Sequence, residues 1–74
     1  MPIEVCTISV PGYCNPSIRD TILWDPESGM LLSAQDDGRP IEYPVTHTTY
    51  EAAIRACATR WGADTRFDLQ WIRA

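Results

Sequence analysis

Residues 48–62, TTYEAAIRACATRWG, are the stretch in which the hydrophobic pattern of this chain changes from the period of a strand to that of a helix. The large apolar residues recur every three or four positions and would form one stripe along a helix: Tyr50, Ile54, Cys57 and Trp61. Residues 48–51 match the Thr-x-x-Glu pattern of a capping box, which predicts the helix start. Gly62 predicts its end. We therefore expect a helix over residues 49–61.

The segments before this helix have the composition of strands. Residues 3–10 are rich in β-branched side chains and predict a first strand. Residues 18–25 and 30–35 predict two more, joined by the turn sequence DPESG at residues 25–29. These two strands would form a hairpin. The later strand would place three apolar residues on one face: Met30, Leu32 and Ala34.

Apolar residues alternate with other residues on both sides of the predicted helix, as they do in strands. After a tight turn at residues 36–38, apolar residues alternate with prolines and Glu42 over residues 41–45. Proline cannot donate to a strand ladder, so this segment predicts an edge strand or an extended arm. Residues 66–73 alternate again and would turn three side chains toward the helix: Phe67, Leu69 and Trp71. We predict one α+β domain over residues 1–74, in the order β-β-β-(β)-α-β. It would be a small antiparallel sheet of 3–5 strands with one helix packed on one face.

Composition excludes several classes of function. The 74 residues carry a net charge of −4 and include no lysine. The acidity argues against direct nucleic-acid binding, and the missing lysine excludes a lysine Schiff base and a P-loop. No apolar run is long enough for a membrane helix, and the first residues do not match a signal peptide. We expect a cytoplasmic protein.

The cysteines and the single histidine do not have the spacing of a metal site. No two of Cys6, Cys14, His47 and Cys57 lie at the short gaps that zinc ligands usually show. We expect no metal, no cofactor and no enzymatic activity. A disulfide between Cys6 and Cys14 and a catalytic pair of Cys14 and His47 are the alternatives.

Three tryptophans lie on predicted apolar faces, where they would pack in the core: Trp24, Trp61 and Trp71. Alternatively, one of them, or Tyr13 or Tyr43, anchors a partner.

The acidic residues are concentrated in one part of the chain. Residues 20–51 contain seven acids and a single base, Arg39, so they carry a net charge of −6, and the remainder carries +2. A field of one sign attracts a basic protein surface. A solvated face that only keeps the domain soluble would carry the same charges. The predicted partner-binding residues are the acids of the hairpin, its turns and the following arm: Asp20, Asp25, Glu27, Asp36, Asp37 and Glu42.

Carboxylates spread along a hairpin can imitate the phosphates of a DNA strand, because a strand rises about 3.3 Å per residue and phosphates lie several ångströms apart. Such a surface would occupy a groove that normally binds nucleic acid.

In length, acidity and the order hairpin, helix, last strand, the chain resembles the small phage-borne anti-CRISPR proteins that act on type I effector complexes. The matching stretch is residues 21–74, with the hairpin at 22–35, the helix ending in Arg60, Trp61 and Gly62, and the last strand at 67–72. The resemblance implies inhibition by binding in the cytoplasm of a bacterial host. Some members mimic DNA, and others hold the complex in an inactive shape.

A second hypothesis is an antitoxin-like or accessory interaction module. It would pair through the edge strand 41–45 or through exposed aromatic residues. Either hypothesis is compatible with a monomer or a homodimer.

Overall fold

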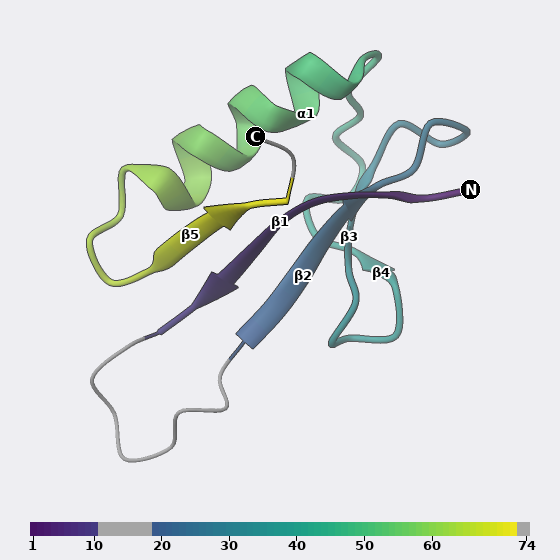
Figure 1. Ribbon diagram of the computed structural model, residues 1–74. Coiled ribbons are helices and arrows are strands. Elements are labelled where there is room, and N and C mark those ends of the chain that lie inside the picture. The colour runs from purple at the N-terminus through teal and green to yellow at the C-terminus, as the bar shows by residue number, and fades with distance from the viewer. Residues whose placement is uncertain (11–18, 73–74) are drawn as a thin grey trace.

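The computed structural model describes residues 1–10 and 19–72 and has the α+β architecture that the sequence predicts. Its elements are β1 (Ile3–Ser9), β2 (Arg19–Trp24), β3 (Leu31–Ser33), β4 (Arg39–Pro40), α1 (Tyr50–Cys57) and β5 (Asp68–Trp71). The five strands form one antiparallel sheet in the order β4-β3-β2-β1-β5. The helix connects β4 at one edge with β5 at the other (Figure 1).

A bulge in β1 lets two successive residues face the core. Ile3 pairs with Trp24 and Cys6 with Ile22, but the register shifts between Glu4 and Cys6. The extra residue is Val5, and both Val5 and Cys6 are buried. A β-bulge places two residues opposite one, so simple alternation in the sequence does not predict this arrangement.

The helix begins at the second of two adjacent threonines. Thr49 has extended backbone angles, and its Oγ1 accepts a hydrogen bond of 3.1 Å from Ala52 N. Thr49 is therefore the N-cap, and the third helical residue is Ala52 rather than Glu51. The predicted capping box of residues 48–51 is wrong by one position.

At its other end α1 continues directly into a π-helical segment, η1 (Ala58–Gly62). The predicted extent of the helix is therefore correct to one residue at each end. Gly62 is its last residue and lacks the positive φ of a glycine C-cap. The predicted apolar stripe is confirmed, because Cys57 and Trp61 are buried and Tyr50 and Ile54 pack against the core.

The core lies between the sheet and the helix and contains only apolar side chains among the described residues. It consists of Val5, Cys6, Ile8, Ile22, Trp24, Leu31, Ala53, Cys57 and Trp61. Removal of such side chains from water is the main force that stabilises a domain of this size.

The face of β3 that packs against the core is not the face that the sequence predicts. Leu31 pairs with Trp24 and is 1% exposed, so the face with Met30, Leu32 and Ala34 is turned away from the helix. Both faces are apolar at this point, which is why alternation alone does not identify the inner one.

Residues 41–45 do not form the expected edge strand. Pairing ends at Pro40, and Ile41 N donates to Leu31 O at 2.9 Å. The chain then turns, with a cis peptide bond between Tyr43 and Pro44 and a hydrogen bond from Val45 N to Glu42 O. The edge strand on this side is β4, which has only two residues.

The tryptophans divide between core and surface. Trp24 and Trp61 are buried as expected, whereas Trp71 is 40% exposed. Trp71 pairs with Cys6 and so points to the helix side, but it lies at the end of β5. The prediction that Trp71 is a core residue is wrong.

Within residues 1–10 and 19–72, no helix has the length and apolar character needed to cross a membrane.

Candidate functional site

The six predicted partner-binding acids lie in three places rather than on one continuous surface. Asp25 and Glu27 belong to the turn between β2 and β3, and Asp36 and Asp37 to the turn between β3 and β4. The two turns lie at opposite ends of the hairpin because β3 runs straight between them (Figure 1). Asp20 lies at the end with Asp36, and Glu42 follows β4.

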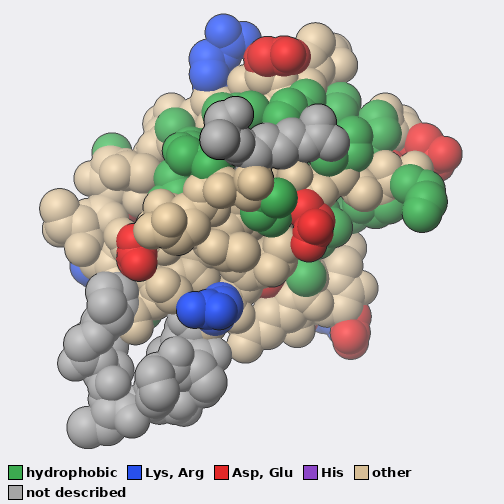
Figure 2. Space-filling model, viewed as in Figure 1, with side chains coloured by type: hydrophobic (Ala, Val, Ile, Leu, Met, Phe, Trp, Pro, Cys, Tyr) green, Lys and Arg blue, Asp and Glu red, His purple; other side chains and the backbone are tan. Residues whose placement is uncertain are grey.

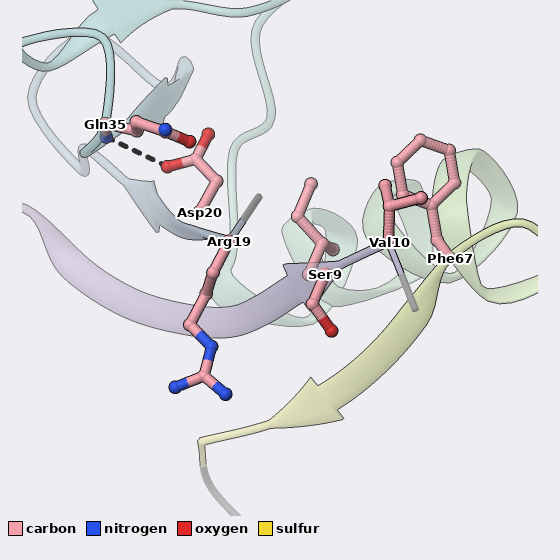
Figure 3. A pocket seen from close by; sticks show the side chains of 7 residues that line it. Ser9, Val10, Arg19, Asp20, Gln35 and Phe67 are labelled. Carbon is pink, nitrogen blue, oxygen red and sulfur yellow. Dashed lines mark hydrogen bonds between the residues drawn. The ribbon is translucent and has the colours of Figure 1, made fainter. Parts of the chain in front are cut away.

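Asp20 is a structural residue of the hairpin. Its carboxylate accepts a hydrogen bond from Ser33 Oγ and one of 2.9 Å from Gln35 N (Figure 3). In β2 it pairs with Ile8, so it lies on the face that packs against the helix. The carboxylate thus ties the start of β2 to the end of β3, and it is not available to a partner in the way the turn acids are.

A small cavity of about 40 Å³ lies beside Asp20. Figure 3 shows its lining, in which Phe67 and Val10 lie at one side while Arg19 points away from them. The lining includes Ile8 and Ser9 of β1. Its volume is about that of one or two water molecules, which is too small for an organic ligand.

Asp25 stabilises the first turn. Its carboxylate accepts hydrogen bonds from Glu27 N at 3.1 Å and from Ser28 Oγ at 3.0 Å. The backbone hydrogen bond from Glu27, followed by that from the Ser28 hydroxyl, lowers the pKa of Asp25 because both stabilise the charged form. The turn ends at Gly29, whose φ of 79° favours glycine.

Glu42 is part of an ionic cluster with residues of the helix and of the loop before it. Its Oε2 lies 3.4 Å from Arg60 Nη1, and its Oε1 lies 3.9 Å from His47 Nε2. Arg60 also lies over the ring of Trp61, with its guanidinium carbon 5.2 Å from the ring centroid. Glu42 Oε1 and His47 Nε2 are buried and have no hydrogen-bond partner among the described residues.

This cluster lines an open groove between the helix and the preceding loop. The groove has a volume of about 490 Å³, and Arg55 also lines it. The sequence predicts Glu42 as a binding residue but does not predict its contacts with Arg60 and His47, since nothing in the sequence brings positions 42, 47 and 60 together.

Three of the six acids remain without a side-chain partner among the described residues: Glu27, Asp36 and Asp37. All three are exposed and lie in turns. Asp37 and Gly38 have φ values of 56° and 75°, and Arg39 N donates to Asp36 O at 3.1 Å, so Asp36 to Arg39 form a tight turn of the kind that joins paired strands. The turn therefore holds two free carboxylates on an ordered backbone.

The face drawn in Figure 2 shows acidic side chains that are dispersed among arginines and apolar groups. No group of three or more potential ligands that could hold a metal ion occurs within residues 1–10 and 19–72. Cys14 and Tyr13, which the sequence suggested as a catalytic thiol, a disulfide partner and an aromatic anchor, lie outside the described residues.

Exposed apolar side chains are a further feature of the surface, and the sequence predicts them only in part. The large ones are Met1, Tyr43, Val45, Trp71 and Ile72. Tyr43 is 76% exposed, so its proposed role as an anchor is compatible with its position.

Comparisons of the chain with protein-family models, with curated proteins and with solved structures found no match.

Proposed function

We propose that this protein is a non-enzymatic inhibitor that binds a basic, nucleic-acid-binding surface of another protein through the acidic turns of its hairpin. The observation that carries the proposal is the trio of exposed carboxylates at those turns that have no side-chain partner within residues 1–10 and 19–72: Glu27, Asp36 and Asp37. The resemblance to anti-CRISPR proteins of type I systems supplies the class of partner, a subunit that recognises target DNA.

These three carboxylates are available to a partner because no side chain of the described residues already binds them. A carboxylate already bonded within its own chain, such as that of Asp20 or Glu42, loses those bonds when it turns to a partner. Glu27, Asp36 and Asp37 lose only water. Asp36 and Asp37 also stand on a turn with defined hydrogen bonds, so little backbone freedom is lost on binding.

The charge of the turns also favours a basic partner. Arg39 is the single base within residues 20–51, which leaves the turns with an excess of negative charge. Carboxylates on exposed turns attract Arg and Lys side chains over about one Debye length, which is ~8 Å at physiological salt. Binding should therefore weaken as salt rises, and DNA should compete for the same groove.

The test compares two triple variants with the same change in net charge. E27Q/D36N/D37N neutralises the three free turn acids, and the matched control E4Q/E51Q/D68N neutralises three exposed acids elsewhere. Each protein is titrated against a purified type I effector complex at low and high salt, with target duplex as competitor. We expect the turn variant to lose affinity at least tenfold while the control stays close to the parent. Equal affinity of both variants would contradict the proposal.

A second candidate function is an interaction module that binds through exposed apolar residues. Tyr43 favours it, because a tyrosine that is 76% exposed beside the half-exposed Val45 is a suitable anchor for a protein partner. The edge strand 41–45 no longer supports this function, since these residues form a turn. Binding by this route would tolerate salt and would be lost in Tyr43→Ala but retained in E27Q/D36N/D37N.

A further inference from the structure

Cys6 and Cys57 meet in the centre of the core. Cys6 lies in the middle of β1 and pairs with Ile22 on one side and Trp71 on the other. Cys57 is the last residue of α1, on the face that packs against the sheet. Both side chains are 0% exposed.

Cys6 and Cys57 are the free cysteines among the described residues, both belong to the same apolar core cluster, and the two thiols are close enough for each to shift the pKa of the other. A side-chain hydrogen bond with Cys57 lowers the pKa of the Cys6 thiol, although burial opposes this shift. The same bond, together with burial, raises the pKa of Cys57. Within the closed core, Cys57 therefore holds its proton more firmly than Cys6.

The surroundings of the pair favour a covalent link over a metal site. The other core side chains are aliphatic or aromatic, so no third ligand faces the two sulfur atoms within the described residues. A disulfide needs an S–S distance of about 2.05 Å and no further ligand. In this pair, one sulfur atom comes from α1 and the other from β1.

We propose that Cys6 and Cys57 form an oxidative modification site, an intramolecular disulfide that links the helix to the central part of β1. This pairing differs from the Cys6–Cys14 alternative that the sequence suggested, and it is independent of the proposed inhibitory function.

The reaction is a thiol–disulfide exchange with a small disulfide such as oxidised glutathione as the oxidant. The Cys6 thiolate attacks one sulfur of the oxidant and releases one thiolate, which gives a mixed disulfide. Cys57 then loses its proton, attacks the Cys6 sulfur and releases the second thiol. Two protein thiols are oxidised, two electrons pass to the oxidant, and the protein loses two hydrogen atoms. Because both thiols are buried in the native state, the exchange takes place during folding or local opening, where the native pKa shifts are lost, and the same disulfide forms when Cys57 attacks first.

The link would have a large effect on stability. Cys6 and Cys57 are 51 positions apart, so the bond closes a long loop and restricts the unfolded chain strongly. For a domain of this size, the midpoint of thermal unfolding should rise by about 10 °C on oxidation.

The experiment uses the full chain, refolded with and without a mixture of reduced and oxidised glutathione. After blocking of free thiols, the protein is digested with trypsin and chymotrypsin. Cleavage after Tyr13 separates Cys6 from Cys14, and cleavage after Arg55 and Arg60 isolates Cys57 in peptide 56–60. We expect a linked pair of peptides 1–13 and 56–60, and a higher thermal midpoint that a reductant reverses.

Cys14→Ser serves as the control variant, because it retains both proposed partners and removes the competing thiol. It should show the same linked peptides and lose two titratable thiols on oxidation. Recovery of Cys57 as a blocked free thiol, as a glutathione adduct alone, or linked to Cys14 would overturn the proposal.

Discussion

The indole nitrogen of Trp24 donates a hydrogen bond of 3.0 Å to the carbonyl oxygen of His47. It also lies 3.2 Å from Gly29 O, and His47 N donates to that same oxygen. One buried side chain in β2 thus connects the first turn of the hairpin with the loop that leads into the helix. This connection fixes where the helix begins relative to the sheet.

Replacement of Trp24 by phenylalanine should test this connection. Trp24→Phe keeps an aromatic ring near Tyr50, whose ring centroid lies 6.3 Å from that of Trp24, but it leaves His47 O without its donor. A buried acceptor without a partner costs about 1–3 kcal/mol. Chemical denaturation should show a fall of this size in the free energy of unfolding. A change below about 0.5 kcal/mol would mean that the hydrogen bond is unimportant.

Two glycines with similar backbone angles provide a second test. Gly29 and Gly38 have φ values of 79° and 75°, so alanine at either is disfavoured by about 1–2 kcal/mol. A Cβ on Gly29 would also lie 3.0 Å from His47 O and 3.1 Å from Thr46 Cβ, whereas nothing lies within 4 Å at Gly38. Gly29→Ala should therefore lower the free energy of unfolding more than Gly38→Ala, which is its control. If both variants lost the same free energy of unfolding, the loop with Thr46 and His47 would be moving away from the added Cβ without cost.

The position of the helix N-cap gives a third test. Thr49 Oγ1 accepts from Ala52 N, so Thr49→Ala should lower the free energy of unfolding by about 1 kcal/mol. Thr48→Ala is the matched control and should change it by less than about 0.5 kcal/mol. A larger loss for Thr48 would support the capping box that the sequence suggested.

The elements that the sequence predicted well are those whose signal is local. The helix has an apolar stripe over three turns, and the hairpin has a turn with Pro26 and Gly29 between two apolar segments. Each of these signals is repeated by several residues that agree, so the period and the turn chemistry identify the element without tertiary information.

The wrong predictions occur where tertiary contacts, and not the local sequence pattern, determine the structure. Residues 41–45 alternate like a strand, but Ile41 packs against the core and Glu42 pairs with Arg60, so the chain turns instead. The Thr-x-x-Glu pattern favours Thr48 as the cap, but the backbone angles of Thr49 and its hydrogen bond from Ala52 N show that Thr49 is the cap. Trp71 has the expected orientation, but it is exposed because it lies at the end of an edge strand.

The six predicted acids show the same limit of prediction from sequence. The charge count identifies the acidic segment 20–51. It does not distinguish the acids that stabilise the fold from those that have no side-chain partner among the described residues. Asp20 bonds to residues at positions 33 and 35, and Glu42 pairs with position 60. Such separations in sequence carry no periodic signal, so only the structure distinguishes Glu27, Asp36 and Asp37, which have no side-chain partner among the described residues, from the other three acids.

A fourth prediction concerns the structural role of Asp20. Asp20→Ala removes the acceptor of Ser33 Oγ and Gln35 N, and the free energy of unfolding should fall by about 1–3 kcal/mol. Asp36→Ala is the control, because its side chain has no partner among the described residues and the variant should unfold like the parent. If Asp20→Ala were as stable as the parent and bound the partner less tightly, Asp20 would be a binding residue after all.

The last prediction concerns acid stability and rests on Asp64. Its carboxylate accepts hydrogen bonds from the Arg66 side chain, at 2.8 Å and 3.1 Å, and from Arg66 N at 3.0 Å. These contacts, with the side chain of Arg66 as the largest cause, lower the pKa of Asp64 from 3.8 to about 2. A carboxyl group whose pKa is lower in the folded state stabilises the fold above its unfolded pKa, and this contribution disappears as pH falls through the folded pKa. Asp25, with its lowered pKa, contributes in the same direction.

Asp64→Asn should therefore have a lower thermal midpoint than the parent at pH 5, and the difference should shrink as the pH falls from about 4 to about 2. Thermal melts of both proteins over this range provide the measurement. Asp68→Asn changes the net charge equally, and Asp68 has no arginine partner among the described residues, so it controls for general charge effects. A difference between parent and Asp64→Asn that stays constant with pH would place the effect of the substitution in the turn geometry rather than in the ionised pair, because only the ionised pair is lost when Asp64 takes up a proton.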